Sequence, residues 1–168
     1  MNDALVMDLL EKVKSRFYGK YRGVVVDVDA ATMRVKASVP SVLPLASTGW
    51  ATACVPYAGP QVGFIMLPEV GSGVWIEFEA GDVSFPIWTG CYWRTDEVPS
   101  DASATVKTIV TKAGSLAFDD DAGSITMKDG NGDSVSLNGG AVTIESANGK
   151  IVADSSGVSV NDGGLTVT

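Results

Sequence analysis

The sequence predicts a mainly β protein in three parts: a short N-terminal helix, a small barrel and a C-terminal region of stacked short strands. Apolar residues recur at three- and four-residue steps in the first eighteen residues, which is typical of a helix. All four tryptophans and all four tyrosines lie between residues 18 and 93, in or next to short segments separated by Gly and Pro. Beyond residue 114, apolar and small polar residues alternate between breaks rich in Asn, Asp and Gly, and no aromatic residue follows Phe118.

The composition of the 168-residue chain narrows the classes of function. A net charge of −8 disfavours nucleic acid as a partner, because phosphate binding needs a basic surface. The sequence has no histidine, which disfavours zinc sites and Ser-His or Cys-His catalysis, so we expect neither an enzyme nor a cofactor. Cys54 and Cys91 form no CxxC pair and are interpreted as small buried hydrophobic residues. The sequence has no apolar run long enough to span a bilayer and no signal-peptide pattern, which favours synthesis in a cytoplasm.

Residues 1–20 are predicted to form a helix that docks on its own domain or on a partner, because one short helix is marginally stable alone. Its apolar stripe consists of Leu5, Leu9, Leu10, Val13 and Phe17. The basic residues near this helix are interpreted as its solvated face rather than as a nucleic-acid-binding arm. They are Lys12, Lys14, Arg16, Lys20 and Arg22.

Residues 21–94 contain five or six short strands, which favours a small barrel or sandwich and fits a barrel of the OB type. The predicted segments are 21–29 (YRGVVVDVD), 33–40, 50–57, 62–68, 71–82 and 85–93. The aromatic residues are expected to supply its core. Glu77 and Glu79 alternate on one predicted strand with Asp82 nearby, and we interpret these carboxylates as a solvated outer face rather than an acid–base site. Residues 95–104 are small and polar, as in a linker.

Residues 105–168 repeat a strand of four or five residues followed by a turn, which indicates stacked strands rather than a globular core. Alternation buries one face of each strand, and a single chain would leave that apolar face wet and its sheet edges open. Three copies wrapped around one axis would cover it, with small aliphatic side chains inside a three-sided prism and polar ones outside. The predicted trimer-core residues are Ile109, Leu116, Phe118, Ile125, Met127, Val135, Leu137, Val142, Ile144, Ile151, Val158, Val160, Leu165 and Val167.

The acidic breaks of this region invite a calcium interpretation, which the spacing does not support. Asp129, Asn131 and Asp133 match the start of an EF-hand loop, but Ser134 and Gly140 occupy the positions that need Gly and Glu. The run 119–121 and this loop are therefore interpreted as turn chemistry. The break at 138–140, Asn-Gly-Gly, is either a hairpin turn or a corner between successive faces of the prism.

The ordered motifs of the middle region resemble those of a known family: the central spike proteins of contractile phage tails, phage baseplate assembly protein V, and the VgrG proteins of type VI secretion. The matching elements follow one another in the family's order. They are YRGVVVDV at 21–28, MRVKASVP at 33–40, WATACVP at 50–56, LPEVG at 67–71, IEFEAGD at 76–82 and PIWTGCY at 86–92.

The resemblance implies an OB-fold followed by an intertwined trimeric β-helix, or β-prism, which agrees with the trimer argument. In such a spike we expect the strands of three chains to share one hydrogen-bond network. The chain departs from some relatives in having no lysozyme domain, no large hub-like portion and no terminal His-x-His iron motif. Its ending resembles spikes that are capped by a separate PAAR-type tip protein. The expected protein is thus a homotrimeric structural spike that the helix and barrel mount on a baseplate hub and that pierces the target cell envelope.

The expected location is a virion tail baseplate or an injection particle that is assembled in the host bacterial cytoplasm. The alternative is an OB-fold module that binds nucleic acid or carbohydrate and carries a β-rich stalk.

Overall fold

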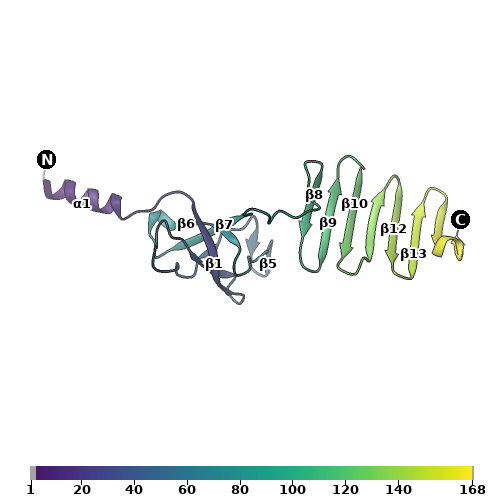
Figure 1. Cartoon of the computed structure of the whole chain (residues 1–168), viewed down its shortest axis with the longest axis horizontal. Coiled ribbons are helices and arrows are strands. Elements are labelled where there is room, and N and C mark those ends of the chain that lie inside the picture. Colours follow the sequence, from purple (N-terminus) through teal and green to yellow (C-terminus); the bar gives the residue numbers. More distant parts are fainter. Residues whose placement is uncertain (1–2, 168) are drawn as a thin grey trace. The chain divides into compact units, whose positions relative to one another are not determined.

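The computed structural model describes residues 3–167 and forms two compact units, Met1–Glu97 and Val98–Thr168 (Figure 1). The boundary between the units falls inside the predicted linker of residues 95–104. The described chain contains one short α-helix, and strands dominate both units, which confirms the mainly β prediction. No helix in the described range is long and apolar enough to cross a membrane.

The N-terminal helix α1 (Asp3–Lys14) ends earlier than the apolar stripe predicts. Phe17 lies beyond it, and the Phe17 N–H donates a hydrogen bond of 2.8 Å to the Gly81 carbonyl. The Phe17 ring packs edge-on against Tyr21 and Phe78, with ring centroids 6.2 and 6.3 Å apart. Contacts with the barrel therefore take Phe17 out of the helix.

The first unit is built on one five-stranded sheet, with strand order β2-β1-β6-β7-β3. The strands are β1 (Tyr21–Asp29), β2 (Arg34–Ser38), β3 (Thr52–Ala53), β6 (Gly73–Phe78) and β7 (Pro86–Tyr92). The sheet curls until its two ends meet, because Ala51 forms an antiparallel bridge with Val35 in β2 and its N–H donates to the Val35 carbonyl at 2.8 Å. This curled sheet is consistent with the expected OB-fold.

Two predicted strands of this unit are shorter than the sequence suggests. The segment 62–68 contributes only β5 (Val62–Gly63), which pairs with β4 (Ala58–Gly59) in a small separate hairpin. The apolar residues that follow β5 lie outside any strand, and their side chains are exposed. They are Phe64, Ile65 and Met66. The 3₁₀ turn η1 (Glu79–Gly81) ends β6, so Glu79 lies outside the strand and does not share a face with Glu77 as predicted.

The barrel core is mainly aliphatic, which corrects the expectation that aromatic residues supply it. Trp88 and Phe78 are buried there, but Trp93 is 66% exposed, and Trp50 and Trp75 are half-buried. Short side chains fill most of the interior of this small curled sheet, whereas the rings of Trp50, Trp75 and Trp93 stay at least partly exposed. The core residues are Val25, Val35, Ala37, Val39, Ala51, Val74, Ile76, Phe78 and Trp88.

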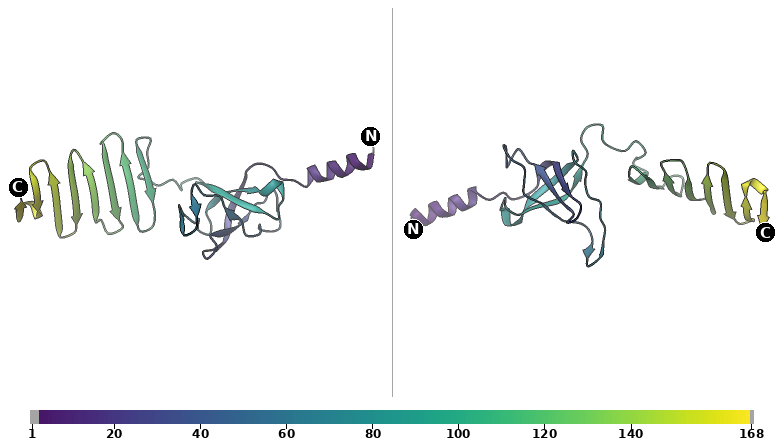
Figure 2. Two further views of the ribbon diagram at one scale, coloured as in Figure 1. Left: turned by 180° about the vertical axis from the view of Figure 1, so that it is seen from behind. Right: turned by 90° about the horizontal axis from the view of Figure 1, so that it is seen from below.

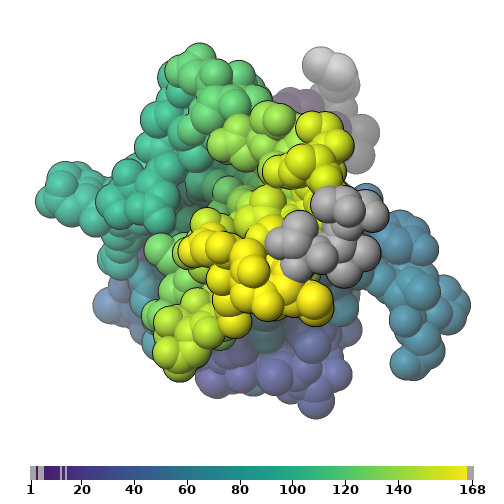
Figure 3. All heavy atoms as spheres, turned by 90° about the vertical axis from the view of Figure 1, so that its right-hand side faces the viewer, coloured from purple at the N-terminus to yellow at the C-terminus, as the bar shows by residue number. Residues whose placement is uncertain are grey.

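The second unit is an eight-stranded antiparallel meander in which strands pair in sequence order. It forms a single layer (Figure 2). Its successive hairpins do not eclipse one another in the end-on view of Figure 3, as expected of a twisted sheet. The strands are β8 (Val106–Val110), β9 (Gly114–Asp119), β10 (Ser124–Asp129), β11 (Ser134–Asn138), β12 (Ala141–Ser146), β13 (Gly149–Asp154), β14 (Gly157–Val160) and β15 (Leu165–Val167).

The meander decides between the two interpretations of the break at 138–140. Asn138 pairs with Ala141, and Gly139 and Gly140 between them have φ values of +58° and +85°. Two central residues with positive φ define the tight turn that matches the twist of a hairpin, and glycine adopts it without steric cost. The break is therefore a hairpin turn within one chain.

The pairing also corrects the predicted hydrogen-bond network. Strands β9 to β14 each have a neighbour from the same chain on both sides, so their backbone groups are already satisfied. Within the described residues, only β8 and β15 lie at an end of the sheet. With this pairing, further copies of the sheet would meet it through side chains along most of its length.

Candidate trimer interface

The strand register places the predicted apolar residues in two continuous rows on one face of the C-terminal sheet. Residues that pair directly across an antiparallel ladder share a face, so the rows can be followed from strand to strand. Row 1 consists of Ile109, Leu116, Met127, Val135, Ile144, Ile151, Val160 and Leu165. Row 2 consists of Lys107, Phe118, Ile125, Leu137, Val142, Ala153, Val158 and Val167.

The opposite face of the sheet carries short and mostly hydroxyl-bearing side chains. Its central row consists of Thr108, Ala117, Thr126, Ser136, Thr143, Val152, Ser159 and Thr166. The sheet therefore has one apolar face and one polar face. The sequence alternation predicts this two-sided pattern, and the register shows that it holds across all eight strands without a slip.

The apolar face is open in the single chain. Met127 is 57% exposed, Ile144 49% and Leu165 60%, whereas Leu116, Val135 and Val160 are half-buried by their neighbours on the sheet. The side chains of Thr166 and Val167 lie outside the described part of the structure, and their places in these rows follow from the backbone register alone. Contiguous apolar surface of this extent on a thin sheet marks an interaction site.

A groove of about 620 Å³ runs beside row 1. Its floor contains Ile109, Leu116, Met127, Val135 and Ile144, and its rim contains polar residues at the ends of the strands, among them Lys128 and Glu145. The groove lies at the side of the sheet where β8 turns into β9, β10 into β11 and β12 into β13. Apolar side chains from another molecule would fit such a groove better than a polar ligand.

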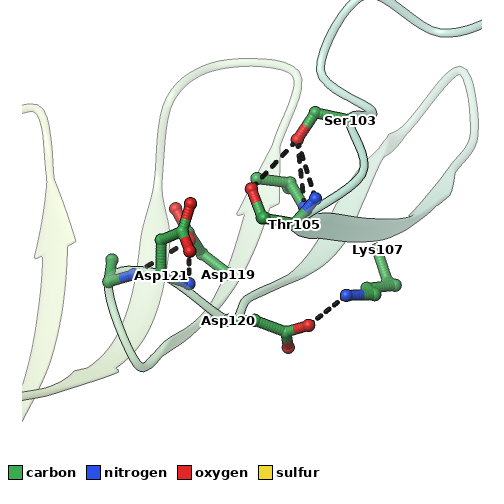
Figure 4. A network of polar contacts seen from close by, with 8 residues as sticks. Ser103, Thr105, Lys107, Asp119, Asp120 and Asp121 are labelled. Carbon is green, nitrogen blue, oxygen red and sulfur yellow. Dashed lines mark hydrogen bonds and ion pairs between the residues drawn. The ribbon is translucent and has the colours of Figure 1, made fainter.

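The apolar face ends in a polar contact at the first strand. Lys107 takes the first position of row 2, opposite Phe118, and its ammonium forms an ion pair with the carboxylate of Asp120 (Figure 4). Ser103 and Thr105, also in Figure 4, hydrogen-bond at the start of β8. The charge of Lys107 limits the apolar stripe at this end of the sheet.

The acidic loops of this unit are turns that aspartate side chains close. Asp129 Oδ1 accepts hydrogen bonds from the N–H groups of Asn131, Gly132 and Asp133 at 2.9 Å each, and Asp119 Oδ1 accepts from Asp121 and Ala122 at 3.0 Å. Desolvation raises the pKa of Asp129, but these N–H groups and the Asn131 amide together hold it below its usual value. Among the described residues there is no cluster of three His, Cys, Asp or Glu side chains that could hold a metal.

The carboxylates of the first unit are engaged in separate ion pairs rather than in one acid–base site. Glu77 pairs with Lys20 at 3.0 Å, and Asp82 pairs with Arg16 at 3.0 Å. Hydrogen bonds from Ser84 and the charge of Arg16 lower the pKa of Asp82.

Arg22 lies over two aromatic rings of the barrel, Trp75 and Tyr92. Its guanidinium lies 5.1 Å from the centroid of Trp75 and 5.0 Å from that of Tyr92, and these two rings pack 5.2 Å apart. A stacking platform for bases or sugars needs an open ring face. The guanidinium of Arg22 therefore reduces the open ring surface on which a base or a sugar could stack.

Two other predicted features lie elsewhere in the first unit. The side chain of Leu5 is outside the described part of the structure, whereas Leu9, Leu10 and Val13 are exposed on α1. Cys54 and Cys91 are free thiols in exposed residues, contrary to the expectation that they are buried. Cys54 follows β3 directly, and Cys91 lies in β7, where it pairs with Val74 of β6.

Comparison with known families gives two matches, one for each unit. Residues 21–93 match the injector OB domain of type VI secretion systems and phage baseplates, and residues 106–166 match the C-terminal trimerisation domain of phage baseplate V. The class is thus that of baseplate injector proteins with an OB domain. Because both matches belong to one architecture and together cover most of the sequence, the chain belongs to the phage baseplate V family. A comparison with curated proteins finds no match.

The trimerisation domain coincides with the sheet whose apolar face is open. It supports a homotrimer and gives the two rows a partner of known kind, namely further copies of the same chain. Both matched families describe structural parts of a baseplate or injector, which supports a structural role as a component of a virion or an injection particle.

Proposed function

We propose that this protein is the homotrimeric central spike of a contractile tail or injection system. In this proposal three C-terminal sheets close around one axis with their apolar faces inward, and the spike pierces the target cell envelope when the tail contracts. The observation that carries the proposal is the pair of apolar rows, continuous over eight strands and open in the single chain.

Burial of these rows would supply the stability of the spike. Each large apolar side chain that moves from water into an interface contributes about 1.5–3 kcal/mol, and the rows repeat this contribution on every strand. The short side chains beyond Phe118 keep the radius of the closed assembly small. If the three chains must separate together before any of them unfolds, unfolding is slow, which suits a part that carries load.

The first unit would mount the spike on the baseplate hub. The exposed side chains of Leu9, Leu10 and Val13 on α1 are available for a hub surface, whereas Phe17 already packs on the barrel. The outer edge of β15 is the place for a separate tip protein of the PAAR type, because β15 is the last strand of the sheet order. Assembly of the particle would take place in the host bacterial cytoplasm.

The oligomeric state tests the proposal most directly. Light scattering coupled to size-exclusion chromatography of the full chain should give about three times 17.4 kDa. A monodisperse monomer with a folded C-terminal sheet would contradict the spike. Saturable binding of a single-stranded oligonucleotide or a glycan by such a monomer would favour the binding-module alternative instead.

A further inference from the structure

The two lateral edges of the C-terminal sheet differ in charge and in shape. Edge 1 is the side with the turns after β8, β10, β12 and β14, and edge 2 is the side with the turns after β9, β11 and β13. Edge 1 carries Lys112, Lys128 and Lys150 together with four acids, Asp129, Asp133, Glu145 and Asp162, so it is less negative than edge 2. Edge 2 carries Lys107 and four aspartates, of which three are consecutive at 119–121.

The shapes of the two edges are complementary as well. The groove beside row 1 lies along edge 1 and is open. Row 2 lies nearer edge 2 and contains Phe118, which is the last aromatic residue of the chain and is 41% exposed. Edge 1 thus offers a hollow and edge 2 a bulky apolar side chain.

Symmetry decides which edges can meet. A three-fold rotation joins unlike surfaces, since a like-to-like contact closes only a two-fold dimer. Edge 1 of one copy must then face edge 2 of the next copy at every corner. A like-to-like contact of edge 2 would also bring the aspartates at 119–121 of two copies together, which is repulsive.

The same rotation sets the heights of the groups that meet. If strands stack along the axis, rotation keeps each strand at its own level, about 4.8 Å from the next. The end of β10 at edge 1 of one copy therefore comes level with the start of β10 at edge 2 of the next. Lys128 lies at the former position, and the turn that contains Asp121 immediately precedes the latter.

The side chains at these two places are available. Asp119 is engaged in its turn and Asp120 in the pair with Lys107, whereas the carboxylate of Asp121 has no hydrogen bond or ion pair within the described residues (Figure 4). Lys128 likewise forms no ion pair within that part of the chain, and it lies on the rim of the groove. By strand alternation Lys128 belongs to the polar face, so its ammonium can pair at the rim while apolar side chains fill the groove.

We propose that the trimer closes edge to edge, with Phe118 of each copy in the row 1 groove of its neighbour and Asp121 paired with the neighbour's Lys128. This inference rests on the proposed trimeric spike and adds the surfaces that join its subunits. In this arrangement the groove, the carboxylate of Asp121 and the ammonium of Lys128 each gain a partner on a neighbouring copy.

Cross-linking of the full chain tests this seam. In a Cys54→Ser/Cys91→Ser background, the pair Asp121→Cys and Lys128→Cys is treated with a short bismaleimide and analysed on a denaturing gel. The expected result is a covalent trimer from the double variant and monomers from each single-cysteine variant. The two positions lie on opposite edges of their own sheet, so a cross-link between them reports contact between copies.

Light scattering on the same samples distinguishes a wrong seam from a wrong oligomeric state. A trimer in solution that fails to cross-link, or a dimer from Lys128→Cys alone, overturns the seam and leaves the spike intact. The absence of a trimer before cross-linking overturns the proposed function and the seam together.

A charge swap provides a second measurement without cysteines. Lys128→Asp and Asp121→Lys should each weaken the trimer. In each variant, every seam should contribute a rise of about 2- to 5-fold in the trimer dissociation constant, since ion pairs at the rim of an interface are weak. The double variant should restore the value toward that of the unmodified chain. Additive losses in the double variant would overturn the pairing.

Discussion

Single aspartate side chains close turns in both units of the protein. Asp29, Asp129 and Asp154 each accept hydrogen bonds from backbone N–H groups within the next four residues. The hydroxyl of Thr32 lowers the pKa of Asp29, and the hydroxyl and N–H of Ser156 lower that of Asp154. A carboxylate with a lowered pKa in the folded state stabilises that state above the pKa of the unfolded chain, about 3.9.

The stabilisation by these aspartates should be lost in acid. It is fully present above pH 4 and declines as the pH falls through the lower pKa of the folded state. Asp129→Asn keeps the acceptor oxygen but removes the titration, so its thermal midpoint should fall less between pH 5 and pH 2 than that of the unmodified chain. Circular dichroism melts at several pH values give this comparison.

Asp129→Ala and Asp96→Asn serve as controls for that measurement. The alanine variant should be less stable than the asparagine variant at neutral pH, because it has no acceptor for the three N–H groups. The carboxylate of Asp96 has no hydrogen bond within the described residues, so Asp96→Asn should keep the acid response of the unmodified chain. An unchanged acid response in Asp129→Asn would contradict the assigned role.

The hairpin is the element that organises the C-terminal unit. Strands β9 to β14 satisfy their backbone groups within their own chain, and the largest unpartnered apolar surface is the face that carries rows 1 and 2. Association of copies therefore depends on side-chain packing and on little else. A charged substitution on the apolar face should therefore weaken association of the copies, whereas the same substitution on the polar face should not.

Met127→Asp and Thr126→Asp form a matched pair on neighbouring residues of β10. Met127 lies in row 1 on the floor of the groove, and Thr126 lies on the polar face. A carboxylate left without a partner in a closed interface costs on the order of 3–5 kcal/mol. Light scattering should show loss of the trimer for Met127→Asp and a retained trimer for Thr126→Asp. Equal behaviour of the two variants would place the interface elsewhere.

The molecule as a whole consists of one unit that has its own core and one that lacks it. The buried residues of the first unit form a closed cluster around Val25, Val35 and Ile76. No residue after 98 in the described part of the sheet reaches the burial of that cluster. The two units should therefore differ in what they need in order to fold.

Truncation tests this difference. The fragment 1–97 should fold with a cooperative melt and remain a monomer, because it keeps the core and lacks the trimerisation domain. The full chain should melt at temperatures that rise with protein concentration, since association stabilises only the folded state. An unfolded fragment would show that the barrel depends on the C-terminal sheet.

Much of this architecture could be predicted from the sequence. The segment YRGVVVDVD is β1 from its first residue to its last, and each C-terminal unit of alternating residues became one strand followed by a turn. The face that carries Leu116, Met127 and Ile144 follows from a period of two, which needs no knowledge of distant contacts. The Gly-rich and Asp-rich breaks are equally local, because they depend on φ and on short hydrogen bonds.

The sequence by itself determined the order of most strands, the apolar face and the likeness to the baseplate V family. Only the tertiary structure decided that Phe17 leaves the helix for the barrel, that residues 64–66 form no strand, and that the hairpins pair within one chain. The first two outcomes depend on contacts between residues that lie far apart in the chain. The third depends on whether a strand pairs with its own chain or with another copy, since the backbone offers the same hydrogen bonds in both cases. A local sequence pattern specifies neither the distant contacts nor the choice of partner strand. The folded chain specifies them, because its native contacts satisfy backbone hydrogen bonds and bury apolar side chains together.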